Sequence, residues 1–390
     1  MKLRPTVAVC ALAALPLSML LGACSLTESN TQDDKGAGPV RVTSSDDGCE
    51  LSATKTGSGT VTFEVKNTGS KVTEFYLYAD DGKRIIGEVE NIGPGLTRDL
   101  VVTAAPGKYV TACKPGMEGD GIRDDFTVTD SGKVSTASEA EQANVKRATD
   151  GYADYVREQS EDLLTRTTEF VAAYKAGDDA KARSLYATAR QPWERIEPVA
   201  ESFGDLDPKM DLREADLEEG QEWTGWHRIE KDLWPPAEGY TRLSKADRAR
   251  YADDLLANTT TLHTRVQTLT YEPTQLGNGS KELMDEVATG KITGEEEIWS
   301  HTDLYDFQAN VEGAKEAFEL LEPILESKDE ELEEQIDERF DALQKLLDKY
   351  RQGDGFVSYD TVTEPQRKEL SDAVNALAEP LSKVSGVVAQ

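Results

Sequence analysis

The spacing of apolar residues changes once along this chain of 390 residues, near Ser138, and this change limits what the chain can fold into. Before it, residues 41–130 contain short runs of β-branched and aromatic residues, such as "GTVTFEVKN" and "TEFYLYADD". Gly, Pro, Asn and Asp separate these runs roughly every 8–12 residues, which is typical of strands joined by turns. The pattern predicts a small antiparallel β-sandwich of about 90 residues.

After the change, apolar residues recur at helical spacing through residues 138–388, and no strand-like alternation continues. The first of these stretches ends in "KAGD", where the glycine is a typical helix stop. Helices joined by short turns predict an all-α bundle. Because the segment is about 250 residues long, two packed sub-bundles are expected rather than one.

The first 24 residues, "MKLRPTVAVCALAALPLSMLLGAC", have a basic start and a short apolar run, as secretory signals do. The run is too short to cross a membrane comfortably as a helix. Its end, "LGAC", resembles a bacterial lipobox, which implies cleavage before Cys24 and a lipid on that cysteine. Residues 25–40 are rich in small and polar residues and predict a flexible tether. The mature protein is therefore expected on the extracytoplasmic face of the cell membrane, anchored by lipid.

The formal net charge of the chain is −31. So acidic a chain does not fit nucleic-acid binding, since phosphate contacts need a basic surface. It also does not fit a protein that lies flat on an anionic membrane. An acidic surface suits a protein that attracts cations, but solubility alone would also explain it.

The four cysteines differ in their expected roles. Cys10 leaves with the signal, and Cys24 is the lipidation site. Cys49 and Cys113 remain as an even pair outside the cytoplasm, where a disulfide is the default. Such a bond would close a loop of about 65 residues and stabilise the fold by about 4 kcal/mol on the chain-entropy model.

The stretch "YVTACKPGMEGDG" resembles the ligand loop of cupredoxins, with Met117 four residues after Cys113. A blue-copper centre also needs two imidazoles, and this chain has no histidine before His227. Carboxylates are the candidate replacement ligands, and an oxygen-rich set favours Fe, Mn or Ca. The alternative is that these acids bind nothing and the cysteines are bridged. The candidate carboxylates are Glu50, Glu74, Glu88 and Glu90.

Three short stretches of the helical half place acids and histidines at spacings that suit a metal site. In "WERIEP" and "GWHRIE" the key residues are three apart, so each pair shares one face of a helix. Imidazole with several carboxylates suits Fe, Mn or Zn, and helical bundles hold iron in this way, although with the order Glu-x-x-His. The residues are Glu194, Glu197, His227 and Glu230, with Asp211 in the loop between the pairs and Glu296, His301, Asp303 and Asp306 in "GEEEIWSHTDLYDFQ".

Neighbouring residues allow a different interpretation. Arg195 and Arg228 lie within the two pairs and could neutralise the carboxylates in place of a metal. A zinc-peptidase motif, His-Glu-x-x-His, is absent because Arg228 and Lys231 occupy the required positions. His263 has no acidic neighbour in the sequence and is expected in the core or on the surface. Gly225 would let another backbone approach the start of the histidine helix.

"GWHRIE" is similar to the Gly-x-His-x-x-Glu signature of imelysin-type domains. The series "ERIEP", "SFGDLDP", "WTGWHRIEKDLW" and "SHTDLYDFQ" resembles the EfeO family, a component of EfeUOB-type iron uptake systems. "CEL", "ENIGPG" and "CKPG" match the cupredoxin-like domain that precedes the bundle in that family. The resemblance covers nearly all of the mature chain. It implies an extracytoplasmic protein that binds iron, as Fe2+ or Fe3+, and works with an EfeU-type iron permease and an EfeB-type haem peroxidase.

Matching of motifs carries the family's proposed sites onto this chain. The resemblance implies a bundle site made of His227, Glu230, Glu194, Glu197, Asp211 and Glu296. It also implies a second metal, Cu, Fe or Zn, at Glu74, Glu90 and Cys113 of the small domain. The protein is expected to be an iron carrier and not an enzyme. Two rival hypotheses are an imelysin-type metallopeptidase and a non-catalytic module that binds a surface polymer or partner.

Overall fold

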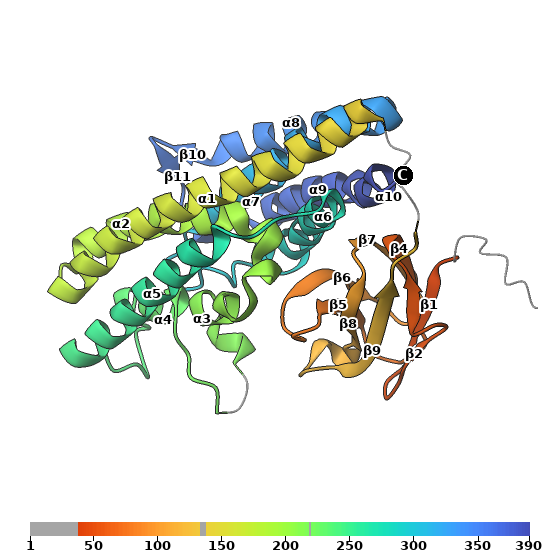
Figure 1. Ribbon diagram of the computed structural model, residues 1–390. Helices are drawn as coiled ribbons and strands as arrows, with labels where there is room; N and C mark the ends of the chain where they lie inside the picture. Colours follow the sequence, from red (N-terminus) through yellow and green to blue (C-terminus); the bar gives the residue numbers. More distant parts are fainter. Residues whose placement is uncertain (1–37, 133–137, 218–219) are drawn as a thin grey trace, which may run out of the picture. The chain divides into compact units, whose positions relative to one another are not determined.

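The β-sandwich predicted from the alternating pattern is present in the computed structural model, which describes residues 38–132, 138–217 and 220–390 (Figure 1). The predicted signal peptide, the lipidation site Cys24 and residues 25–37 of the tether lie outside the described residues. The strands are β1 (Val40–Ser44), β2 (Cys49–Leu51), β3 (Lys55–Gly57), β4 (Gly59–Asn67), β5 (Thr73–Ala79), β6 (Ile85–Ile92), β7 (Thr97–Ala104), β8 (Gly107–Cys113) and β9 (Ile122–Thr129).

The strands form two sheets, and the pairing is not purely antiparallel. One sheet has the order β2-β1-β4-β7 and the other β3-β9-β8-β5-β6. The prediction of an antiparallel sandwich was wrong for two strand pairs, because β1 with β4 and β3 with β9 are parallel. In the first pair the chain leaves β1, passes through β2 and β3, and returns beside β1 in the same direction. Turn residues alone do not reveal such a crossover.

The sandwich core lies between the two sheets. Phe63 of β4 packs against Phe75 of β5 and Phe126 of β9, with ring centroids 5.1 and 5.2 Å apart. Cys49 and Cys113 form a disulfide that links β2 of one sheet to the end of β8 in the other. The covalent link and the shared apolar core therefore hold the same two sheets together.

The first helix of the bundle begins after Ser138 and ends before Gly177, as the sequence indicates. Ser138 accepts a hydrogen bond from the Glu141 amide at 3.2 Å, and the Glu141 carboxylate accepts one from the Ser138 amide at 2.6 Å, a capping box. At the other end Gly177 has φ 80° and ψ 15°, the left-handed conformation that glycine adopts without strain. Helix α1 (Glu139–Ala176) spans 38 residues, longer than the other helices described.

The remaining helices pack around one continuous apolar core. Helix α7 contacts α1, α2, α6 and α8, so it joins the early and late helices of the bundle (Figure 1). A short hairpin of β10 (Arg351–Gln352) and β11 (Gly355–Phe356) interrupts the late helices, which the helical pattern did not predict. The helices are α2 (Asp179–Ile196), α3 (Asp207–Met210), α4 (Trp226–Leu233), α5 (Lys245–Val266), α6 (Pro273–Thr289), α7 (Asp303–Lys328), α8 (Glu330–Leu347), α9 (Glu364–Leu381) and α10 (Val384–Val388).

Sandwich and bundle belong to one compact unit, and α6 makes most of the contact between them, together with the turns of residues 197–206 and α10. Asn278 Nδ2 donates to the Val101 carbonyl of β7 at 3.0 Å, and the Thr103 amide donates to Thr274 Oγ1 at 3.1 Å. Arg98 and Asp285 form an ion pair at 3.6 Å beside them. Across the described ranges, no helix is both long and apolar enough to span a bilayer.

Candidate metal centre

The histidine of "GWHRIE" lies in the first turn of α4, and a glycine brings it close to an acidic loop. Gly225 has φ 87°, and a Cβ atom there would lie 2.1 Å from the Met210 carbonyl oxygen. The predicted close backbone approach is confirmed. Because Met210 ends α3, this contact places Asp211 beside His227, although the two are 16 positions apart in the sequence.

The His227 ring lies between two pairs of carboxylates and is almost fully buried, with 1% of its surface exposed. Its Nε2 atom lies 3.3 Å from Asp211 Oδ1 and 3.6 Å from Glu296 Oε1, without a hydrogen bond among the described residues. Its Nδ1 atom lies 3.3 Å from Glu230 Oε2 and 3.9 Å from Glu297 Oε1. Each nitrogen therefore faces a set of oxygen atoms that could share a cation with it.

Glu230 is held in place by the turn that precedes α7. Its Oε1 atom accepts hydrogen bonds from the amides of Trp299 and Ser300, at 3.0 and 2.7 Å. The other oxygen faces His227 Nδ1, an arrangement that fixes the orientation of a metal-binding imidazole. The geometry favours Nε2, with Asp211 and Glu296, as the metal-binding side of the ring. Glu230 then orients the ring.

Arg190 of α2, which the sequence did not single out, lies at the middle of the acidic cluster with no exposed surface. Its guanidinium pairs with Asp211 and lies 2.5 Å from Glu194 Oε1 and 2.9 Å from Glu297 Oε1. Glu296 and Asp306 lie farther away, at 3.5 and 3.6 Å. One buried cation therefore contacts five carboxylates from three parts of the chain.

Lys291 is a second buried cation, and it changes the predicted role of two site residues. Its Nζ atom lies 2.7 Å from Glu197 Oε1 and 3.1 Å from Glu194 Oε2. Asn310 of α7 donates to both carboxylates, at 2.6 and 3.0 Å. The "ERIEP" pair therefore binds an ammonium group, and the structure does not place it around the His227 ring as the prediction had it.

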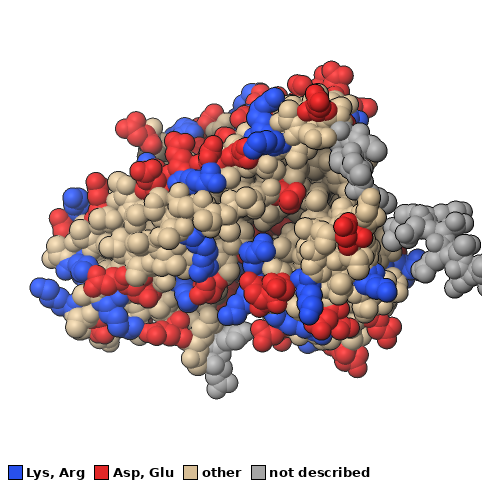
Figure 2. Space-filling view, viewed as in Figure 1, with Lys and Arg blue, Asp and Glu red and all other residues tan. Residues whose placement is uncertain are grey.

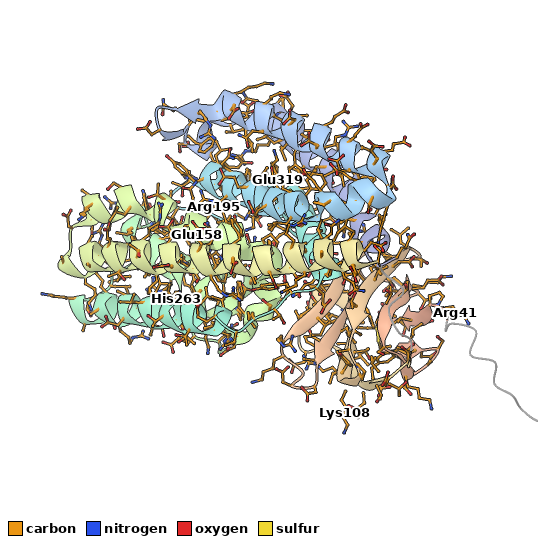
Figure 3. All side chains as sticks on the ribbon, turned by 45° about the horizontal axis from the view of Figure 1, so that its top comes forward. Arg41, Lys108, Glu158, Arg195, His263 and Glu319 are labelled. Atoms are coloured by element: carbon orange, nitrogen blue, oxygen red, sulfur yellow. A yellow bond between two sulfur atoms is a disulfide. The ribbon has the colours of Figure 1, made fainter. Side chains whose placement is uncertain are left out.

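The two arginines proposed as neutralising partners point elsewhere. Arg195 pairs with Glu312 at 2.8 Å, and Arg228 donates to the Tyr240 hydroxyl at 3.1 Å. His263 lies on α5, where its Nδ1 atom is 3.1 Å from the Ser160 hydroxyl (Figure 3). This position agrees with the core-or-surface interpretation. Neutralisation does occur at the centre, but through cations that the motifs do not contain.

The acids after Glu296 add to the negative charge of the cluster. Asp303 and Asp306 are fully buried, and neither Oδ atom of Asp306 has a hydrogen bond within the described residues. Glu297 accepts hydrogen bonds from the Tyr186 and Ser300 hydroxyls, at 3.1 and 2.5 Å. Eight carboxyl groups thus meet three cationic side chains, Arg190, Lys291 and protonated His227. Burial raises the pKa of Glu197, Glu297 and Asp306 well above the usual range, so part of this excess of acids consists of neutral carboxyl groups.

The pKa values of the site residues follow from these contacts. Burial raises the pKa of Asp211, but the Arg190 guanidinium and His227 outweigh it and hold the pKa well below the usual range. Burial also opposes the ionised form of Glu296, yet Lys291 and His227 lower its pKa to about 2. Burial and Arg190 lower the pKa of His227, but the carboxylates of Asp211, Glu230 and Glu296 beside its ring raise it well above its ordinary value. The metal-free centre therefore contains the ionised carboxylates of Asp211 and Glu296 beside an imidazolium.

The stability of the metal-free protein is expected to fall by about 2 kcal/mol or more between pH 5 and pH 8. Burial raises the pKa of Asp207, Glu282 and Asp303 to about 7, and that of Glu201 to about 8. A carboxyl group with a higher pKa in the folded chain is protonated more readily there, so stability is lost as the pH rises from about 4 through the folded pKa. The lowered pKa of Glu296 affects stability only below that window.

Urea denaturation in the presence of a chelator, at pH 5 and at pH 8, measures this dependence. Asp303→Asn is the matched variant, since the amide oxygen can still accept the hydrogen bond that the Glu297 amide donates at 3.3 Å. Its free energy of unfolding should fall less between pH 5 and pH 8 than that of the original protein. A stability that stays constant or rises with pH would contradict the prediction.

The predicted small-domain site is not assembled in the structure. The Cys113 sulfur is bonded to Cys49, so no thiolate is available while that bond is intact. The carboxylates of Glu74 and Glu90 instead accept hydrogen bonds from the Tyr76 hydroxyl, at 2.8 and 3.2 Å. The cupredoxin-type position is therefore occupied by a disulfide.

The face of the protein drawn in Figure 2 does not repeat the concentration of acids found at the centre. Figure 2 shows acidic side chains spread over the visible face with lysines and arginines among them. The net charge of −31 therefore includes a dispersed surface part as well as the buried cluster. Among the residues that the structure describes, the buried cluster is where close carboxylates meet an imidazole.

Comparison with known proteins places both halves in described families. Residues 148–384 match the family model described as imelysin, and residues 14–128 match the model of a cupredoxin-like domain. An "Efem/EfeO family lipoprotein" of Staphylococcus haemolyticus (strain JCSC1435) is 48% identical over 259 residues, which cover 65% of this chain and 88% of that protein. A protein of the same name from Staphylococcus aureus (strain MRSA252) is 47% identical over 257 residues, 65% of this chain and 89% of that protein.

Proposed function

Because the chain belongs to the Efem/EfeO family, we propose that it is the iron-binding component of an EfeUOB-type uptake system, which captures iron outside the cytoplasm and delivers it to a membrane permease. The observation that supports this most is the buried Nε2 atom of His227, which has no hydrogen bond among the described residues and faces Asp211 and Glu296. Iron would be the cargo of this site.

The donor set suits iron in either valence. Carboxylate oxygens favour hard cations, and an imidazole nitrogen adds affinity for Fe, Mn and Zn over Ca and Mg. Arg190 and Lys291 already balance part of the acidic charge, so the centre binds a cation without having to bring separated acids together. Binding without further chemistry is what a carrier requires.

The "LGAC" sequence and the name lipoprotein given to the relatives support an anchor at Cys24. A lipid would keep the carrier beside the membrane that contains its permease. An EfeU-type permease and an EfeB-type haem peroxidase are the partners that the family resemblance implies.

The main rival is a metallopeptidase of the imelysin type. Hydrolysis would require a metal-bound water and a general base. At this centre Asp211 is paired with Arg190, and Glu230 accepts a hydrogen bond from the Ser300 amide, so neither carboxylate is free to act as the general base. The second histidine of a zinc-peptidase motif is also absent from "HRIEK". A carrier is therefore favoured over an enzyme.

The decisive experiment is calorimetric titration of the purified protein with Fe2+ under anaerobic conditions, repeated with Fe3+ supplied as a weak chelate. His227→Ala should weaken binding by more than about 100-fold, because even the loss of an outer-shell partner costs 10–100-fold. Glu230→Gln should weaken iron binding by about 10–100-fold, because the role of Glu230 is to orient the His227 ring.

His263→Ala is the matched control, because it removes the same side chain from α5, where the imidazole contacts Ser160 and no site residue. It should bind iron like the original protein. Iron binding that survives His227→Ala unchanged would disprove the proposed site. Chelator-sensitive cleavage of a peptide library that is lost in His227→Ala would favour the peptidase instead.

A further inference from the structure

A second group of acids lies outside the histidine cluster, in a cleft where β6 of the sandwich faces α6 and the short helical turns of residues 197–206. The cleft has a volume of about 200 Å³. Ten of its sixteen lining residues are acidic, and one, Arg213, is basic. Asp211 and Glu296 line part of the same cleft, so it reaches the bundle centre.

Glu88 of β6 distinguishes this cleft from an ordinary acidic surface. Its side chain lines the cleft although the residue is only 8% exposed, and among the described residues its carboxylate has no hydrogen bond or ion pair. By contrast, Glu282 lies 3.0 Å from Lys281 Nζ, and Glu90 accepts a hydrogen bond from Tyr76. Buried carboxyl groups are normally protonated, paired or bound to a metal, so an unpaired one that faces a cavity is a candidate cation ligand.

Close backbone packing holds the walls of the cleft in place. A Cβ atom on Gly279 of α6 would lie 1.7 Å from the Pro198 carbonyl oxygen, so only glycine permits this contact. On the other side, the Asn278 side chain donates to the Val101 carbonyl. The carboxylates are therefore positioned by the packing of α6 against its neighbours, without a cation between them.

We infer that this cleft is a second cation site, which binds a hydrated hard metal ion of charge +2 or +3 through Glu88, Glu201, Glu282 and Glu286. Oxygen-only ligands favour such ions over soft metals. The volume far exceeds the ~15 Å³ that one water needs, so an ion can enter with part of its hydration shell. The site goes beyond the iron carrier function, since it contains no imidazole and uses other residues.

The test counts bound Tb3+, a hard trivalent ion, by equilibrium dialysis and metal analysis of the purified protein. Glu88→Gln/Glu201→Gln should bind one ion fewer per chain than the original protein. Asp125→Asn/Glu158→Gln is the control, because it removes one exposed acid from each half and the same total charge. It should bind as many ions as the original protein. A local readout is Tb3+ luminescence excited through tyrosine, which Tyr76→Phe should weaken without changing the ion count.

His227→Ala separates this site from the bundle centre. Loss of one ion in each of the two site variants agrees with both proposals. Loss only in Glu88→Gln/Glu201→Gln supports the cleft and contradicts the bundle site. The cleft site is disproved if that variant binds as many ions as its control. Thermal melting without metal checks the fold, and the site variant should melt no lower than the control, since glutamine removes like-charge repulsion.

Discussion

Replacement of Arg190 by methionine is expected to lower the free energy of unfolding of the metal-free protein by about 3–5 kcal/mol, because it leaves several buried carboxylates without their shared cation. The guanidinium contacts Glu194, Asp211 and Glu297 directly and has no exposed surface. Urea denaturation followed by tryptophan fluorescence measures the effect. All five tryptophans lie in the helical half, so the signal reports on the bundle.

Arg195→Met is the matched control on the same helix. Arg195 makes one ion pair, with Glu312, and 23% of its side chain is exposed, so its removal should cost less than about 1 kcal/mol. An added cation should restore part of the stability lost in Arg190→Met, because it supplies the missing positive charge. Equal losses in the two variants would contradict the role assigned to Arg190.

Removal of the disulfide, in Cys49→Ala/Cys113→Ala, is expected to destabilise the sandwich by about 4 kcal/mol on the chain-entropy model. The two cysteines are 64 positions apart, and the bond links the two sheets. Amide hydrogen exchange of β5 and β8 measures the loss locally, since these strands pair beside Cys113.

Tryptophan fluorescence provides the control for that variant, because the sandwich contains no tryptophan. The midpoint reported by fluorescence should change much less than the exchange rates of β5 and β8. Treatment of the original protein with a reductant should reproduce the effect. Unchanged exchange in these strands would show that the disulfide adds little to the stability of the sandwich.

The parts of the fold that depend on local signals could be predicted from the sequence. The helix stop in "KAGD" is the left-handed Gly177, and Pro198 stands two positions after the end of α2 at Ile196. The close approach at Gly225 was also predictable, because a glycine has no Cβ atom and so lets another backbone segment come into contact with the start of the helix. The parallel strand pairs were not predictable, since strand order depends on contacts between segments far apart in the chain.

The site was predicted in part. The motifs brought His227, Asp211 and Glu296 into one group, and the structure places them together. Arg190 could have been noticed, because it stands four positions before Glu194 and so shares a helix face with it. Lys291 could not, because it stands in "GKITG", 97 positions from Glu194, and no local pattern marks it as a partner. Its role follows only from the packing of α2 and α7 around the turn that contains it.

The cations buried at the centre have a consequence for how tightly cargo can be held. Arg190 and Lys291 are part of the chain, so they cannot diffuse away when a metal ion arrives. The centre thus resembles an ion exchanger whose counterions are covalently attached. Each bound metal ion must share the carboxylates with the side chains of Arg190 and Lys291. Such competition limits affinity and shortens the time for which an ion stays. If the protein is the carrier proposed above, these tethered counterions make release of the ion as much a property of the fold as its binding.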